Sequence, residues 1–236
     1  AQTHASLRRH LLEEAHETLE ALDARAEIDD DEPDHERDVH LAEELGDLLY
    51  QIFFHARLGA ERGAFTVTDV ARGIHDKLVV RHPHVFGDVV ASDSDTVLAN
   101  WEAIKREEKG RVSAMDGVPS GLPALLLALK VQKRAAGVGF DWEGGPEIAY
   151  SDVVDELDEL MAEPSEHEVG DLLFAAVQVA RRLDHDPEAA LRGAAARFES
   201  RFREVERLAE EDGTPIDDTS ETRLLDWWEQ AKRTVG

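Results

Sequence analysis

Cysteine is absent from this 236-residue chain, and its absence excludes disulfides and thiolate metal sites. Basic residues are scarce as well: 26 Lys and Arg stand against 52 Asp and Glu, so the formal net charge is −26. A charge of that sign argues against broad binding to nucleic acid or anionic membranes, because both are polyanions. No apolar run is long enough to span a membrane, and the chain does not open with a signal-peptide pattern. We therefore expect a cytoplasmic protein with neither nucleic acid nor membrane as a partner.

Aromatic residues make up only 6% of the chain, whereas Ala, Leu and Glu are abundant, which favours helices. Apolar residues recur with a period near 3.6, and the alternation typical of strands is almost absent. We predict an all-α protein with helices at residues 5–26, 36–62, 66–81, 95–109, 122–136, 146–162, 165–184, 187–211 and 219–233. A stretch with Gly, Pro and small polar residues makes 113–121 the best linker, between domains at 1–112 and 122–236.

The two predicted domains share sequence blocks in the same order. The segment ELGDLL from Glu44 recurs as EVGDLL from Glu168. Three further blocks recur: LEEAHE at 12–17 with VDELDE at 154–159, RGIHDKLVVR at 72–81 with RGAAARFESR at 192–201, and WEAIK at 101–105 with WEQAK at 228–232. Four ordered matches imply two copies of one helical unit.

Both copies place acidic pairs beside an apolar helix face. Glu44 and Asp47 lie three residues apart on the flank of one stripe, and Glu14 and Glu17 lie similarly on the preceding helix. Packing the two helices together would gather four carboxylates, which cannot all stay ionised without compensation. A divalent cation would compensate them, and all-oxygen ligation suits Mg²⁺ or Mn²⁺. The alternative is a solvated acidic face, because a chain this acidic has roughly ten acid-x-x-acid pairs by chance.

The segment EEAHE at 13–17, followed after a spacer by ELGD at 44–47, resembles the EExxE…ExxD signature of the MazG nucleoside triphosphate pyrophosphohydrolases. The resemblance continues through RHPHVFGD at 81–88, KVQKRAAGVGFDW at 130–142 and GDLLFAAVQVAR at 170–181, in the tandem two-domain form. It implies an all-α fold with four-helix-bundle active sites, usually in a dimer. It also implies hydrolysis of a nucleoside triphosphate to the monophosphate and pyrophosphate.

By matching positions, the resemblance also implies the residues of each site. The Mg²⁺ ligands would be Glu14, Glu17, Glu44 and Asp47 in the first copy, and Glu156, Glu159, Glu168 and Asp171 in the second. Glu13 and Asp155 fill the leading motif position, where they would orient ligands or the attacking water. The candidates for the general base are Glu13, Glu17 and Glu159. The second copy departs from the pattern, because its leading residue is Asp and its spacer between Glu159 and Glu168 is short, so the division of labour between the copies stays open.

Basic and aromatic residues recur after each acid block and would complete a nucleotide site. The basic pairs are Lys77 with Arg81 and Arg197 with Arg201, and the terminal helices carry Trp101 with Lys105 and Trp228 with Lys232. Lys and Arg would hold the triphosphate, while each Trp would stack on a base. The alternatives are a solvated basic edge for the pairs and a core or dimer contact for each Trp.

These residues support one leading hypothesis: a homodimeric, Mg²⁺-dependent nucleoside triphosphate pyrophosphohydrolase of broad base specificity, for which Mn²⁺ could substitute. Its role would be nucleotide-pool housecleaning, by metal-assisted displacement. Two alternatives stay open. One is a related all-α pyrophosphatase of narrow specificity, for dUTP or phosphoribosyl-ATP. The other is a non-catalytic acidic helical module that binds metal for assembly.

Overall fold

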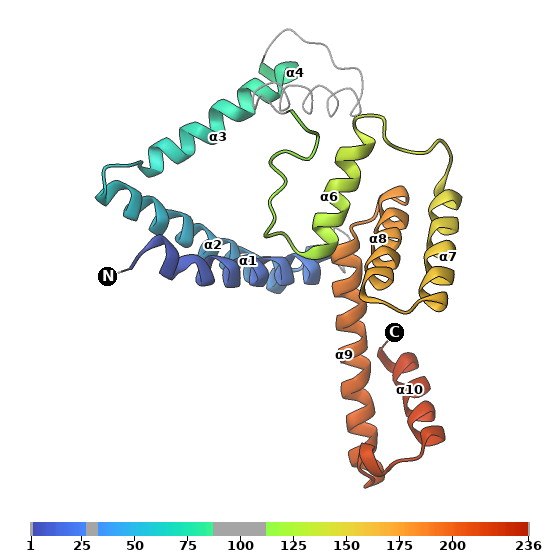
Figure 1. Cartoon of the computed structure of the whole chain (residues 1–236). Helices are drawn as coiled ribbons and strands as arrows, with labels where there is room; N and C mark the ends of the chain where they lie inside the picture. Colours follow the sequence, from blue (N-terminus) through green and yellow to red (C-terminus); the bar gives the residue numbers. More distant parts are fainter. Residues whose placement is uncertain (1, 27–32, 87–111, 236) are drawn as a thin grey trace. The chain divides into compact units, whose positions relative to one another are not determined.

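The computed structural model describes residues 2–26, 33–86 and 112–235. Within these ranges every regular element is a helix and no strand forms, so the predicted all-α class is confirmed (Figure 1). Every predicted helix within the described residues is present, with ends that agree to within about two residues, and the predicted helix at 95–109 lies outside the described residues. The short helix Pro83–Phe86 was not predicted. The chain divides into two compact units, Ala1–Arg111 and Val112–Gly236, so the predicted linker at 113–121 falls within the second unit.

The first unit is built on an antiparallel helical hairpin of α1 (His4–Ala26) and α2 (His35–Glu61) (Figure 1). Asp34 begins α2, and its carboxylate accepts hydrogen bonds from the first backbone N–H groups of the helix. Small residues such as Ala21 and Ala56 are buried between the helices, which allows close packing. The Thr18 hydroxyl donates to the carbonyl of Glu14 at 2.8 Å and lies 3.3 Å from the carbonyl of Glu44 on α2. These contacts fix how the two helices align.

The hairpin is followed by α3 (Val67–Arg81) and the short α4 (Pro83–Phe86). Thr66 begins α3 with a capping box: its hydroxyl accepts from the N–H of Asp69, whose carboxylate accepts from the N–H of Thr66 at 2.8 Å. The turn before α3 packs its aromatic ring on α2, since a Cβ added at Gly59 would lie only 2.7 Å from the ring of Phe65. Glycine at this position therefore lets the turn close.

The second unit contains α6 (Ala124–Ala136), α7 (Pro146–Ala162), α8 (Glu166–Arg182), α9 (Pro187–Asp212), the 3₁₀ turn η1 (Ile216–Asp218) and α10 (Glu221–Val235). Helices α7 and α8 form a second antiparallel hairpin, because Pro164 turns the chain and the Ser165 hydroxyl caps α8 by accepting from the N–H of Glu168. Helix α6 packs against α8, where the Gln132 side chain donates to the carbonyl of Phe174 at 2.8 Å.

Helix α10 packs on α9 around a small apolar core (Figure 1). The core consists of Val205, Leu208, Ala209, Trp227 and Ala231. Gly213 ends α9 in the left-handed conformation, with φ of 69°, which lets the chain turn back toward α10. Among the helices that the structure describes, none has both the length and the apolar character of a membrane span.

Candidate active site

Three carboxylates of the first unit meet where α1 packs against α2. Glu14 of α1 and Glu44 and Asp47 of α2 each offer an oxygen, and these oxygens all lie within 4.8 Å of one another. Glu14 is half-buried, and the side chain of Glu44 is only 14% exposed. Two oxygens bound to one Mg²⁺ at about 2.1 Å are at most about 4.2 Å apart, so small side-chain adjustments would let all three share an ion. The structure thus brings together three of the four acids predicted as ligands in this copy.

The hairpin interface holds Glu14 in place. Thr18 bonds to the backbone of Glu14, and Gln51, buried on α2, donates from its side-chain amide to Glu14 Oε1 at 3.3 Å. Gln51 follows Asp47 by one turn on the same face of α2. Neither Thr18 nor Gln51 was predicted as part of the site. The available signal was a polar residue inside the apolar stripe of each helix.

Glu17 and Glu13 lie outside this cluster of three. Glu17 is exposed one turn along α1 from Glu14, and desolvation followed by the charges of Glu14 and Glu44 raises its pKa. Glu13 instead forms an ion pair with Arg9 at 3.2 Å. Glu17 is therefore electrostatically coupled to the cluster, whereas Glu13 is engaged elsewhere on α1.

The hairpin of the second unit gathers its acids into two overlapping clusters. Glu156 and Glu159 of α7 meet Glu168 of α8, and Glu168 also meets His167 and Asp171; in each cluster the ligand atoms lie within 4.8 Å of one another. His167 Nδ1 lies 2.7 Å from Asp171 Oδ2. All four acids predicted as ligands in this copy therefore lie in one of the two clusters, and Glu168 lies in both.

The charges of the second hairpin interact across both clusters. Desolvation, followed by the charge of Asp171, raises the pKa of Glu156. A hydrogen bond to its own backbone, followed by the charge of Asp171, raises the pKa of His167. His167 was not predicted to be part of the site. The sequence feature that could have identified it is its i,i+4 spacing from Asp171 on α8. Asp155 is exposed on α7 and joins neither cluster in the described part of the chain.

The candidate ligands have little positive charge beside them. Over residues 2–26, 33–86 and 112–235, no Lys or Arg forms an ion pair with any of them, and the imidazoles beside them are those of His40, 3.5 Å from Glu44, and His167. The faces beside the acids are also open, because a Cβ added at Gly46 or Gly170 would meet nothing within 4 Å. Clustered carboxylates without basic partners are a donor set that fits Mg²⁺ or Mn²⁺.

The predicted phosphate-binding residues lie on α3 and α9, outside the two hairpins that carry the acids. Lys77 is exposed and Arg81 is half-buried on α3. Arg197 is exposed and Arg201 is half-buried on α9. Each pair occupies one side of its helix at the predicted i,i+4 spacing, and its contact with phosphate stays a prediction.

The predicted base-stacking residue of the second copy lies at the edge of the α9–α10 core. The Trp228 ring contacts the ring of Phe198, with centroids 5.3 Å apart. Lys232 forms an ion pair with Glu229 on the same helix. The equivalent residues of the first copy, Trp101 and Lys105, lie outside the described residues.

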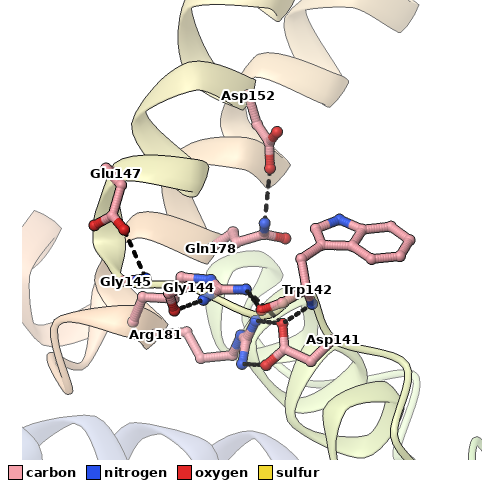
Figure 2. A network of polar contacts seen from close by, with 9 residues as sticks. Asp141, Trp142, Gly144, Gly145, Glu147, Asp152, Gln178 and Arg181 are labelled. Carbon is pink, nitrogen blue, oxygen red and sulfur yellow. Dashed lines mark hydrogen bonds and ion pairs between the residues drawn. The ribbon is translucent and has the colours of Figure 1, made fainter.

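A polar network ties the loop between α6 and α7 to the end of α8 (Figure 2). Asp141 accepts hydrogen bonds from Arg181 Nη1 at 2.8 Å, Arg181 Nη2 at 2.9 Å and Arg182 Nη2 at 2.8 Å. Arg182 also donates to the carbonyls of Trp142 and Gly144, each at 2.9 Å. The hydrogen bonds from Arg181, followed by the charges of the two Arg residues, hold the pKa of Asp141 below its ordinary value despite partial burial. The loop is thus anchored to α8 at several points.

Known proteins resemble the chain over nearly its whole length. Residues 2–86 match the family model of the MazG nucleotide pyrophosphohydrolase domain. The chain is 44% identical to a nucleoside triphosphate pyrophosphohydrolase of Escherichia coli (strain K12), over 98% of this chain and 88% of that protein. It is 42% identical to the nucleoside triphosphate pyrophosphohydrolase/pyrophosphatase MazG of Thermotoga maritima, over 98% of this chain and 87% of that protein. A nucleoside triphosphate pyrophosphohydrolase of Mycobacterium tuberculosis is 46% identical over 58% of this chain and 39% of its own length. The helical fold, the acid clusters and this similarity together establish that the chain belongs to the MazG family.

Proposed function

We propose that this chain is a divalent-cation-dependent nucleoside triphosphate pyrophosphohydrolase of broad base specificity that removes surplus or damaged nucleotides. Water would form a new bond to phosphorus as the anhydride bond between the α and β phosphates breaks. The products would be the nucleoside monophosphate and pyrophosphate. The observation that carries the proposal is the convergence of carboxylates in each helical hairpin, without Lys or Arg partners among the described residues.

The residues of the first hairpin would bind the cation and so position the substrate. Glu14, Glu44 and Asp47 supply the oxygens, and Gln51 keeps Glu14 oriented through its hydrogen bond at 3.3 Å. In the second hairpin, the corresponding oxygens come from the overlapping clusters around Glu168. A bound Mg²⁺ or Mn²⁺ would neutralise phosphate charge and lower the pKa of water.

Glu17 is the best-placed acceptor for the proton of the attacking water in the first unit. It lies one turn along α1 from Glu14 and outside the cluster of three ligands, so its carboxylate is available to accept a proton. Glu13 is a weaker candidate because Arg9 already engages its carboxylate. In the second unit the corresponding residue is Glu159, which is exposed at the edge of its cluster.

The departing pyrophosphate requires positive charge, because the hairpins themselves are acidic. The i,i+4 basic pairs on α3 and α9 would supply it, as donors placed where negative charge develops. Arg is suited to this role because its guanidinium contacts phosphate through two nitrogens.

We also propose that the enzyme is a homodimer. Helix α2 leaves large apolar side chains about half exposed: Leu45 at 48%, Leu49 at 50% and Phe53 at 50%. A hairpin of two helices cannot bury such a face, whereas a four-helix bundle with the hairpin of a second copy would. Sedimentation should then give twice the monomer mass of 26.3 kDa.

Product analysis tests the activity. The wild-type protein, given Mg²⁺ and each nucleoside triphosphate in turn, should release pyrophosphate and the monophosphate, and a chelator should stop the reaction. Glu44→Ala and Glu168→Ala should each lower the activity of their own unit by on the order of 100-fold. Glu43→Ala and Glu166→Ala, exposed acids beside the clusters, are the matched controls and should keep activity. Release of orthophosphate alone, or full activity in the Glu44/Glu168 double variant, would contradict the proposal.

A further inference from the structure

Two histidines of the first unit meet where the beginning of α1 lies beside the end of α2 (Figure 1). His4 is the first residue of α1, His55 lies on α2, and their Nδ1 atoms are 2.8 Å apart. Both side chains are half-buried, and the two ring planes are parallel to within 3°. The nitrogens are closer than the roughly 3.5 Å at which two ring faces touch, so the rings meet edge to edge through a hydrogen bond between the Nδ1 atoms.

This hydrogen bond depends on the number of protons that the two imidazoles carry. One Nδ1 must carry the hydrogen and the other must be bare, because an N–H group donates and cannot accept. If both imidazoles were protonated, both Nδ1 atoms would carry hydrogens, and two N–H groups would point at each other across 2.8 Å. The doubly protonated pair therefore cannot keep this contact.

A single added proton is also disfavoured in this position. In the neutral pair the donating imidazole has a bare Nε2, and the added proton would go there. The Nε2 atoms of both His4 and His55 are buried, and neither has a hydrogen-bond partner among the residues that the structure describes. An imidazolium N–H in that place would be a buried charged group without an acceptor, which is costly. The packed arrangement therefore favours neutral imidazoles.

The groups around His4 also oppose a positive charge. Arg62, directly after α2, contributes a charge of the same sign, and His55 would do so once protonated. The positive end of the helix dipole acts in the same direction, because His4 lies in the first turn of α1. The ring of Phe65, in the turn before α3, packs against His4 with centroids 6.2 Å apart and carries no charge. Desolvation, followed by the charges of Arg62 and His55, accordingly lowers the pKa of His4.

We propose that the His4–His55 pair is a pH-sensitive contact that holds the first turn of α1 on α2 while both imidazoles are neutral and releases it when they are protonated. Release exposes both side chains to water, where they take up protons, so acid favours the open form. The contact contributes its full stability above the open-state pKa of an imidazole, about 6.5, and loses that contribution as the pH falls below this value. His4 precedes Glu14 by ten residues, or roughly 15 Å of helix, so the contact lies away from the acid cluster and does not depend on the proposed function.

Hydrogen exchange of the full-length chain tests the release. Once the pH dependence of the chemical exchange rate is removed, the amides of residues 7–11 report the equilibrium constant for local opening of α1. Each imidazole that stays neutral when packed and has a pKa of about 6.5 when released raises this constant about tenfold between about pH 7.5 and about pH 5.5. We therefore expect a rise of about tenfold or more in the wild type.

A double variant separates the protons from the packing. His4→Asn/His55→Asn keeps a donor and an acceptor near the two Nδ1 positions but cannot take up protons, so its opening constant should change by less than about twofold over the same range. His75→Gln, which removes an exposed imidazole of α3, is the matched control and should show the wild-type rise.

Proton NMR of the wild type adds a measurement that needs no variant, and it keeps the test readable if the double variant fails to fold. The Cε1–H signal of His4 should titrate at a lower pH in the folded chain than in the urea-unfolded chain. The proposal is overturned if that signal titrates at the same pH in both states, or if the double variant shows the same rise in opening as the wild type. A wild-type opening constant that stays constant or falls in acid would overturn it as well.

Discussion

Replacing Asp141 by Asn should destabilise the second unit, because it removes the carboxylate that contacts two nearly buried guanidinium groups. The side chains of Arg181 and Arg182 are only 12% and 8% exposed, and both donate to Asp141. Asn keeps the shape of Asp but lacks the charge, and its amide nitrogen cannot accept from either Arg. The substitution therefore leaves cationic groups inside the fold without their counter-charge.

The size of the effect follows from the burial of the partners. Breaking a fully buried ion pair costs about 3–5 kcal/mol, whereas a fully exposed pair contributes about 0–1 kcal/mol. Asp141 is 33% exposed, so solvent screens part of the interaction, although the guanidinium groups stay shielded. We expect Asp141→Asn to lower the free energy of unfolding by about 2–3 kcal/mol at neutral pH.

The loss should also depend on pH in a defined direction. The hydrogen bonds from Arg181 hold the pKa of Asp141 below its ordinary value, so the carboxylate stabilises the fold at any pH above its unfolded-state pKa of about 3.9. That contribution disappears as the pH falls further, through the lower folded-state pKa. The free energies of unfolding of the wild type and of Asp141→Asn should therefore differ most at neutral pH and converge below about pH 4.

Urea unfolding of the full-length chain, followed by circular dichroism and tryptophan fluorescence from neutral pH to about pH 3, measures both effects. Asp226→Asn is the control, because Asp226 is exposed on α10 and forms no ion pair within the described segments. A difference between Asp141→Asn and the wild type of less than about 0.5 kcal/mol, or one that stays constant with pH, would refute the reasoning.

Substitutions in the first unit separate packing from metal binding. Gly59→Ala places a Cβ 2.7 Å from the Phe65 ring and should lower the free energy of unfolding by about 1–3 kcal/mol. Gly73→Ala, where a Cβ meets nothing within 4 Å, should raise the free energy of unfolding by about 0.5–1 kcal/mol. Thermal unfolding measures both changes, and two changes of the same sign would contradict this account. Mg²⁺ at about a hundred times its dissociation constant should stabilise a binding unit by about 2.7 kcal/mol. Glu44→Gln should reduce that gain in urea unfolding and Glu43→Gln should not; an undiminished gain in Glu44→Gln would exclude Glu44 as a ligand.

The helices and the acid clusters could be predicted because short-range chemistry determines them. Ser165 and Asp186 each accept a hydrogen bond from the first turn of the helix that follows, which is a signal visible in the sequence. The apolar stripe of α2 dictates which side packs on α1, so it also dictates that Glu44 and Asp47 lie at that interface. Once two helices form a hairpin, acids that face the interface at the same level along the helix axes lie close together. The periodicity of two neighbouring helices therefore predicted that Glu14, Glu44 and Asp47 converge, whereas the acids of the second hairpin were implied by the resemblance to the MazG family.

The polar network between α6, the following loop and α8 could not be predicted, because its contacts follow no period. Asp141 is 40 residues from Arg181, and Gln132 is 42 residues from Phe174. In the sequence, nothing distinguishes Asp141 from other acidic residues in loops, or Arg181 from other basic residues near helix ends. Only when α6 and the following loop pack on α8 do the partners of these hydrogen bonds meet. Each acid cluster thus needs two helices, whereas the network around Asp141 needs a third element. We therefore expect substitutions in residues 130–145 to change how the loop packs on α8 while the carboxylate clusters stay intact.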